Sequence, residues 1–308
     1  MRDAKELRVF VGPEQVPVLE EAVLAGGAAL SGLREADAII YYGDDDPETL
    51  RQMMHDGVQW VQLPHAGIEP WTGAGLVREA PVFTCAAGMY GEAVAEHALA
   101  LMLAAARGLA THAMASEWRS AVSHSFAGST VAIIGAGGIG AALARIMAPF
   151  SIQVNVVSDR PVDFPVVRRV PRTEYRSILH DADYLVLAAP ATPETAKMIS
   201  TQELHLMKKD SWLINVARGE LVDTGALVDA LTKGDIGGAA LDVTDPEPLP
   251  QGHPLWELPN VLITPHCANT RESYWRGLAE RTRNNVRHIV TTGGFVGLEG
   301  RVVPSRGY

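Results

Sequence analysis

The stretch Thr130-Val131-Ala132-Ile133-Ile134-Gly135-Ala136-Gly137-Gly138-Ile139-Gly140 decides the fold of this chain. Its apolar run predicts a buried strand, and the GxGxxG pattern that follows predicts a tight turn into a helix. The first glycine permits the turn, the second admits a pyrophosphate, and the third lets helix and strand pack closely. Free N–H groups at the helix start would face the phosphates. The stretch therefore predicts a dinucleotide-binding unit rather than a glycine-rich turn without a ligand.

Similar apolar strands lie on both sides of this stretch. They are expected at residues 7–11, 37–42, 58–62 and 81–84, and again at 153–158, 184–188, 212–216, 238–243 and 261–264. Helix-like segments separate them, which predicts an α/β fold with doubly wound parallel sheets. The strands of the second half are apolar throughout, as expected for sheets covered on both faces. An Ala-rich helix at 91–107 and a polar, irregular segment at 108–129 divide the two series.

Length and composition set the class of protein. The chain has 308 residues and 33.0 kDa, more than one domain usually holds. Apolar residues make up 47% and charged residues 20%, which excludes a disordered chain. A net charge of -10 is poorly suited to nucleic acid, so we expect no such partner.

Two cysteines exclude a disulfide scaffold and a four-cysteine zinc site, and they favour a cytoplasmic setting. The N-terminal residues do not form a signal-peptide pattern. The longest apolar run, Ala98 to Ala106, is far shorter than the roughly 20 residues of a membrane span. We therefore expect no membrane partner.

The end of the strand at 153–158 predicts how the adenosine ribose is bound. An acidic side chain there would accept from a 2′-hydroxyl, whereas an arginine would suit a 2′-phosphate. The sequence runs Ser158-Asp159-Arg160. Ser158 with Arg160 favours NADP, and Asp159 would favour NAD if the strand were one residue longer. The residues thus predict NAD(P) as the cofactor with a slight preference for NADP(H), although Arg160 could also be an ordinary loop charge.

Three polar residues follow apolar strands of the second half: Arg218, Glu247 and His266. Open α/β sheets bind ligands at the carboxyl ends of their strands, so these side chains can converge. A histidine can give a proton to a carbonyl oxygen near neutral pH, and a carboxylate can orient its imidazole. An arginine can grip a substrate carboxylate with two hydrogen bonds. The set predicts hydride transfer to a keto acid, although each residue alone would more often be structural.

Combined, these segments resemble the D-isomer-specific 2-hydroxyacid dehydrogenase family. The matching segments are residues 94–99, 135–140, 215–219, 241–243, 247–249, 254–256, 264–266 and 306–308. The resemblance implies two Rossmann-like or flavodoxin-like α/β domains with an active-site cleft between them. A discontinuous substrate domain would comprise residues 1–97 and 273–308, and a dinucleotide-binding domain residues 98–272. The segment 108–129, with Trp118, would be a dimerisation arm of a homodimer, and core packing is the alternative role of Trp118.

The resemblance also implies roles for single residues. His266 would be the acid/base, Glu247 its partner and Arg218 the substrate anchor. The loop at 65–68 would bind the substrate carboxylate through the backbone of Ala66, Gly67 and Ile68, whereas contact with His65 is not required by the pattern. Asp242 would contact the nicotinamide carboxamide. The full cofactor-binding set would be Gly135, Gly137, Gly138, Ile139, Gly140, Ser158, Asp159, Arg160, Pro190, Thr195, Val216, Ala217, Asp242 and His266.

Within the family the sequence looks most like glyoxylate/hydroxypyruvate reductases, so a small 2-keto acid, reduced to the D-2-hydroxy acid, is the expected substrate. An NAD(H)-sensing corepressor with little turnover is the alternative, because fold does not fix function. No metal site is expected, since His97 has no second histidine at helical spacing. Cys267, next to His266, is expected to be structural rather than a nucleophile.

Overall fold

The computed structural model describes residues 6–118 and 123–304. Residues 306–308 and part of the segment 108–129 therefore lie outside the described residues. The chain forms two compact units, Met1–Tyr90 with Arg271–Tyr308, and Gly91–Thr270. The boundaries expected after residues 97 and 272 fall inside α4 (Gly91–Ala106) and α9 (Arg271–Thr292), and the structure divides at the start of each of these helices.

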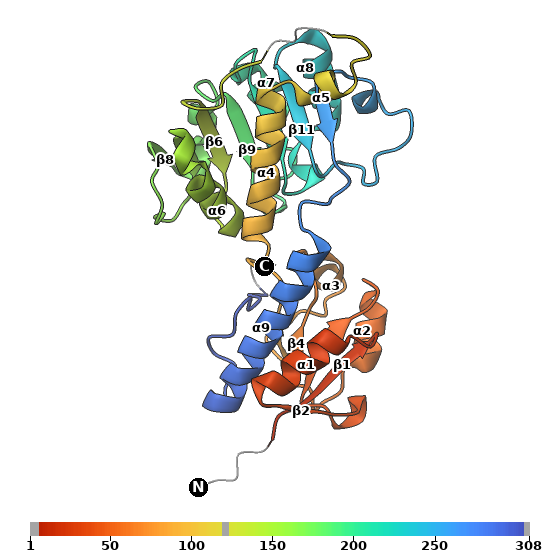
Figure 1. Ribbon diagram of the computed structural model, residues 1–308. Coiled ribbons are helices and arrows are strands. Elements are labelled where there is room, and N and C mark those ends of the chain that lie inside the picture. Colours follow the sequence, from red (N-terminus) through yellow and green to blue (C-terminus); the bar gives the residue numbers. More distant parts are fainter. Residues whose placement is uncertain (1–5, 119–122, 305–308) are drawn as a thin grey trace. The chain divides into compact units, whose positions relative to one another are not determined.

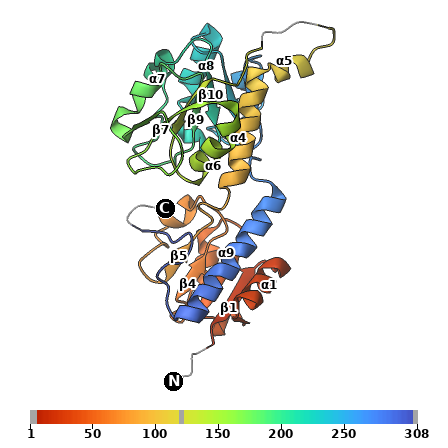
Figure 2. The ribbon, with the colours of Figure 1, turned by 60° about the vertical axis from the view of Figure 1, so that its left-hand side comes forward.

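Unit 1 contains a parallel five-stranded sheet in the order β2-β1-β3-β4-β5. The strands are β1 (Arg8–Pro13), β2 (Ala29–Leu30), β3 (Ala38–Tyr42), β4 (Trp60–Gln62) and β5 (Val82–Thr84). Helices α1 (Pro17–Gly26) and α9 lie side by side along one face, as Figures 1 and 2 show, whereas α2 (Pro47–Met53) and α3 (Glu69–Gly73) pack on the other.

Side chains of β3 show why both faces are covered. Ala38 and Ile40 belong to the core beneath α1 and α9, whereas Ile39 and Tyr41 belong to the core beneath α2 and α3. Successive residues of a strand point to opposite faces, so an all-apolar strand needs two cores. The strand at 29–30 was not expected, since an edge strand of two residues carries no pattern of its own.

Unit 2 contains a parallel seven-stranded sheet in the order β12-β11-β10-β9-β6-β7-β8. The strands are β6 (Thr130–Ile134), β7 (Gln153–Val157), β8 (Arg168–Val170), β9 (Tyr184–Leu187), β10 (Trp212–Asn215), β11 (Gly238–Leu241) and β12 (Val261–Ile263). The helices are α4, α5 (Leu109–Ala113), α6 (Gly138–Met147), α7 (Thr201–Leu206) and α8 (Thr224–Lys233). Short 3₁₀ helices complete the chain at Leu33–Glu35, Ala148–Phe150, Arg172–Ile178, Gly219–Leu221 and Pro254–Trp256.

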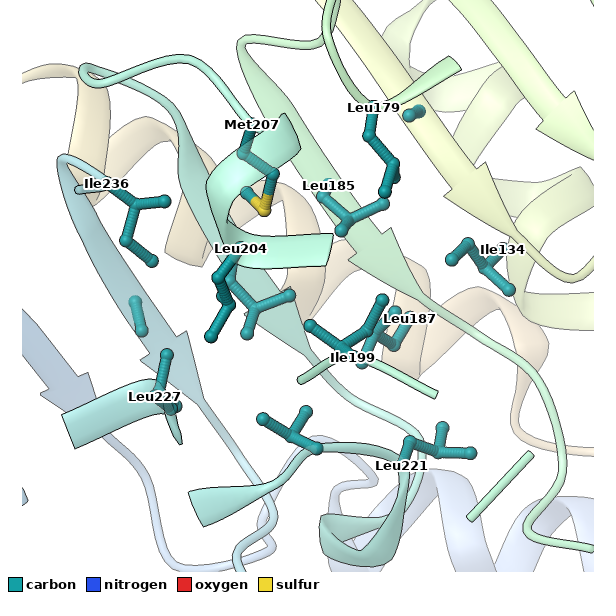
Figure 3. Packing of buried hydrophobic residues seen from close by; sticks show 14 of the residues in the cluster. Ile134, Leu179, Leu185, Leu187, Ile199, Leu204, Met207, Leu221, Leu227 and Ile236 are labelled. Atoms are coloured by element: carbon teal, nitrogen blue, oxygen red, sulfur yellow. The ribbon is translucent and has the colours of Figure 1, made fainter. Parts of the chain in front are cut away.

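One large core of unit 2 lies between the sheet and the helices α7 and α8 (Figure 3). Leu185 and Leu187 of β9 pack there with Leu204 of α7 and Leu227 of α8. On the opposite face α4 and α6 pack together, and α4 also contacts β10 and β11. The sheet is thus covered on both faces by helices.

Candidate active site

The three glycines of the fold-deciding turn have different structural requirements. Gly135 has φ +108°, and a Cβ there would lie 2.5 Å from the Ala188 carbonyl oxygen. A Cβ at Gly140 would collide with the carbonyl oxygen of Gly135, so both positions are fixed by packing. A Cβ at Gly137 would meet nothing within 4 Å. Gly137 directly precedes α6, which begins at Gly138, so the residues here fit a nucleotide pyrophosphate that approaches the backbone closely.

The polar segment after β7 is a turn held by its own side chains. Ser158 Oγ accepts from the amide of Arg160 at 3.2 Å and donates to its carbonyl at 2.7 Å. Asp159 Oδ1 accepts from the amide of Arg172 at 2.9 Å. Arg169 Nη1 donates to the carbonyl of Ser158 at 2.9 Å. Because β7 ends at Val157, Ser158 is the first residue beyond the strand. The carboxylate of Asp159 is engaged by the first residue of the 3₁₀ helix at Arg172–Ile178.

Thr195 shapes the loop after β9. Its side chain is buried, its hydroxyl donates to the carbonyl of Pro190 at 2.8 Å, and its oxygen accepts from the amide of Thr192 at 2.8 Å. Thr195 therefore closes the turn that presents Pro190. A role in shaping this loop was not part of the sequence prediction, which placed Thr195 in contact with the cofactor.

Arg218 is carried by a loop that Asn215 fixes. Asn215, at the end of β10, accepts from the amide of Ala217 at 3.1 Å and donates to the carbonyl of Arg218 at 2.9 Å. A Cβ at Gly219 would collide with the carbonyl of Thr244. The Asn-Val-Ala-Arg-Gly sequence thus brings the Arg218 loop against the segment that follows β11 and leads to Glu247.

His266 and Glu247 form a short side-chain contact. Nδ1 of His266 lies 2.6 Å from Oε1 of Glu247, and the two side chains are 52% and 42% exposed. The loops come from β12 and β11, which are neighbours in the sheet. His266 adopts φ +50°, a left-handed conformation that is uncommon outside glycine. With Nδ1 directed at the carboxylate, Nε2 is the ring nitrogen left for another group.

Asp242 is buried directly behind this histidine. Its carboxylate accepts from Thr264 Oγ1 at 2.5 Å and from the amides of Cys267 and Ala268, each at 3.0 Å. Burial by itself would raise its pKa. Hydrogen bonds from His97, Thr264 and the two amides outweigh burial and hold the pKa of Asp242 below its ordinary value. Asp242 is therefore an ionised carboxylate that organises the segment carrying His266.

The loop predicted to bind the substrate carboxylate lies in unit 1, between β4 and α3. His65 Nε2 lies 3.3 Å from Oδ1 of Asp45, and the carbonyl of His65 accepts from the amide of Ala86 at 3.0 Å. In the part of the chain that the structure describes, the amides of Ala66 and Gly67 donate to no other protein group. Ile68 is buried and anchors the loop. Unused neighbouring N–H groups of this kind can bind an anion.

The described part of the segment 108–129 presents apolar side chains to the outside. Trp118 is fully exposed and Met114 is 86% exposed. Core packing of Trp118 within its own chain, the alternative raised by the sequence, is therefore wrong for this structure. None of the described helices is long and apolar enough to cross a membrane.

One group of potential metal ligands lies beside the site, and the expectation that no metal binds remains a prediction. Among the described residues, His97, Asp242 and Cys267 place one ligand atom each within 4.8 Å of one another. His97 lies on α4, with Nε2 3.0 Å from Thr264 Oγ1 and 3.3 Å from Asp242 Oδ1. The sequence did not predict this contact, because its partners lie far apart in the chain and no motif links them.

Comparison with known proteins decides the family. Residues 99–268 match the NAD binding domain of the D-isomer specific 2-hydroxyacid dehydrogenases, which is more than half of the chain. The chain belongs to the D-isomer specific 2-hydroxyacid dehydrogenase family. It is an NAD(P)-dependent D-2-hydroxyacid dehydrogenase, and its nicotinamide cofactor binds to the unit that contains the glycine turn.

Two relatives cover most of this dehydrogenase. An uncharacterised protein of Corynebacterium melassecola is 38% identical over 86% of the chain and 89% of its own length. A glyoxylate reductase of Thermococcus litoralis is 31% identical over 84% of the chain and 82% of its own length. Another, from Korarchaeum cryptofilum, is 34% identical over 65% of the chain, and this chain spans 63% of that relative.

A family member from Xanthobacter autotrophicus Py2, solved in complex with NADPH and MES, has the same fold as this dehydrogenase. Its TM-score is 0.84 at 26% identity, and the alignment covers 98% of this chain and 99% of that one. The expectation of two doubly wound parallel-sheet α/β units is thereby confirmed.

Proposed function

We propose that this dehydrogenase reduces a small 2-keto acid of the glyoxylate or hydroxypyruvate type to the D-2-hydroxy acid, with His266 as the acid/base. The contact of 2.6 Å between His266 Nδ1 and Glu247 Oε1 carries the proposal. A carboxylate on Nδ1 fixes the tautomer and ring orientation and stabilises the imidazolium. The glyoxylate reductases among the relatives support the substrate class.

When bound, the reduced nicotinamide would supply a hydride to the keto carbon. His266 then gives the proton on Nε2 to the carbonyl oxygen, so the C=O bond becomes an alcohol and the imidazole becomes neutral. Glu247 retains its negative charge and stabilises the imidazolium before transfer. Arg218 of unit 2 is proposed as the substrate anchor, because a guanidinium favours a carboxylate. In unit 1, the backbone amides of Ala66, Gly67 and Ile68 are proposed as further donors to an anion.

For the cofactor we propose a preference for NADPH over NADH. The position directly after β7 is the neutral Ser158, and the neighbouring Asp159 carboxylate accepts from the amide of Arg172. Arg160 supplies a positive charge that suits a 2′-phosphate. Pro190, Val216 and Ala217, at the ends of β9 and β10, and Asp242 complete the proposed nucleotide contacts, with Gly138, Ile139 and Gly140 at the pyrophosphate.

We also propose a homodimer in which the segment 108–129 contacts a second copy, supported by the exposed Trp118 and Met114. A cytoplasmic location is supported by the free thiols of Cys85 and Cys267. The acidic composition gives no support to a nucleic-acid partner.

A panel of 2-keto acids with NADPH and with NADH tests the proposed function. We expect glyoxylate and hydroxypyruvate to be reduced with oxidation of the cofactor, which is measured as loss of the reduced nicotinamide absorbance at about 340 nm. The rate of oxidation should be higher with NADPH than with NADH. Chiral analysis of the product should give the D isomer. Turnover of bulky keto acids alone would contradict the substrate class, and turnover by a His266→Gln variant at the wild-type rate would contradict the role of His266.

A further inference from the structure

We infer that His97 is a positioning residue for His266, acting through Thr264 and Asp242. The inference rests on the proposed role of His266 as the acid/base. His97 lies on α4, whereas Thr264 and His266 belong to the segment after β12. The link is therefore a contact between a helix and the loop that carries the proposed acid/base.

The protons of this cluster can be assigned from its geometry. Asp242 is ionised and can only accept, so the hydroxyl of Thr264 donates its single proton to Asp242 Oδ1, at 2.5 Å. His97 Nε2 lies 3.0 Å from Thr264 Oγ1 and 3.3 Å from Asp242 Oδ1, and both oxygens must accept from it. Nε2 of His97 therefore carries a proton. The histidine donates to the hydroxyl of Thr264, and this hydroxyl donates to the carboxylate of Asp242.

The carboxylate at the end of this series holds the backbone around His266. The amide of His266 donates to the carbonyl of Asp242 at 2.8 Å, and the amides of Cys267 and Ala268 donate to its side chain. Three successive N–H groups are thus fixed by one residue. These bonds hold His266 at φ +50°, a conformation that persists only where its surroundings fix it.

Strand order explains why support from α4 is needed. Among the described residues β12 is the edge strand of its sheet and pairs with β11 alone, so the segment after it has a strand neighbour on one side. His97 contacts this segment from α4 and is itself only 21% exposed. Loss of its donor would remove the support that Thr264 and Asp242 receive from α4, and a small displacement of a catalytic group is costly for the rate.

The same atoms argue against a metal ion at His97, Asp242 and Cys267. A histidine nitrogen binds a metal only when it is unprotonated, and the assigned proton on Nε2 is already used. Both carboxylate oxygens of Asp242 also accept from protein donors. The cluster is therefore hydrogen-bonded from within, and its ligand-like composition reflects a positioning network.

Variants of His97 and Thr264 test the inference. His97→Leu removes the donor, whereas His97→Gln keeps an N–H group near the position of Nε2, and His180→Leu makes the same change at an exposed histidine. We expect His97→Leu to lower kcat by about 10- to 100-fold with little change in cofactor Kd. His97→Gln and His180→Leu should stay within about threefold of wild type, because they keep the network. Equal losses in His97→Leu and His97→Gln would overturn the inference.

The thiol of Cys267 reports on the segment without any need for turnover. Cys267 is exposed and Cys85 is buried, so a thiol reagent added to the folded enzyme should label Cys267. Labelling should be several-fold faster in His97→Leu than in wild type or His97→Gln. If His97→Leu fails to fold, a comparison of Thr264→Val with Thr264→Ser tests the same contact, because only the serine keeps a hydroxyl. Unchanged labelling in the donor-free variants would overturn the inference, as would Zn²⁺ inhibition that requires both His97 and Cys267.

The two readouts separate this inference from the proposed function. Full activity in His266→Gln would refute the acid/base role, while faster labelling of Cys267 in His97→Leu would still show that His97 orders the segment. Conversely, loss of turnover in His266→Gln together with wild-type kcat and labelling in His97→Leu would refute only the role of His97.

Discussion

Oε1 of Glu247 lies 2.6 Å from Nδ1 of His266, although the two residues follow different strands. Because this pairing orients the imidazole, we predict that Glu247→Gln lowers kcat by about 10- to 100-fold, and that His266→Gln lowers it by about 100- to 10,000-fold. Steady-state kinetics measure both losses, and cofactor binding followed by fluorescence should be unchanged. A larger loss from Glu247→Gln than from His266→Gln would contradict this order of roles.

Gly137 should be replaceable for folding but not for cofactor binding. A Cβ there meets no protein atom within 4 Å, whereas one at Gly140 would collide with a carbonyl. Gly137→Ala is therefore expected to change the free energy of unfolding by less than about 1 kcal/mol. It should weaken cofactor binding by about tenfold or more. Gly140→Ala, the matched control, should destabilise the protein markedly. Wild-type cofactor affinity in Gly137→Ala would exclude a close approach at this glycine.

Cofactor preference should change at the end of β7. Ser158→Asp places a carboxylate at the first position beyond the strand, so we predict a preference for NADH over NADPH. The ratio of kcat/KM for the two cofactors measures the change, and Arg160→Ala should reduce the NADPH rate alone. An unchanged ratio in both variants would place the 2′-phosphate elsewhere.

Asp242 should make stability depend on pH. Its folded-state pKa is lowered, so its contribution is present above its ordinary pKa of about 3.9 and is lost as pH falls further. Asp242→Asn should cost about 1–3 kcal/mol at pH 7, because an amide cannot accept from all its donors. Denaturant unfolding should show the gap between variant and wild type narrowing below about pH 4. A gap that widens in acid would contradict an ionised Asp242.

Association should depend on Trp118, which is fully exposed in one chain. Trp118→Glu is predicted to shift a dimer toward monomers in sedimentation velocity, because a buried carboxylate at an interface is costly. Val167→Glu is the control, since Val167 is also exposed, at 68%, but lies outside the segment 108–129. Identical sedimentation of all three proteins would refute the proposed interface.

The glycine turn and the positions of Arg218, Glu247 and His266 could be predicted from sequence, since each follows an apolar strand whose carboxyl end can be located. Edge strands such as β8 (Arg168–Val170) could not, because two of its three residues are charged. The link from His97 to Thr264 was also missed. It depends on how α4 packs against the sheet, and no local pattern encodes a contact between residues 167 positions apart.

The order β12-β11-β10-β9-β6-β7-β8 separates two tasks in space. The residues proposed for proton transfer and substrate binding in unit 2 follow β10, β11 and β12. Those proposed to distinguish the two cofactors follow β7, the second strand from the opposite edge of the sheet. Substitutions at one end need not disturb the other. Cofactor preference and reaction chemistry can therefore change independently among related dehydrogenases, and protein engineering can alter either one separately.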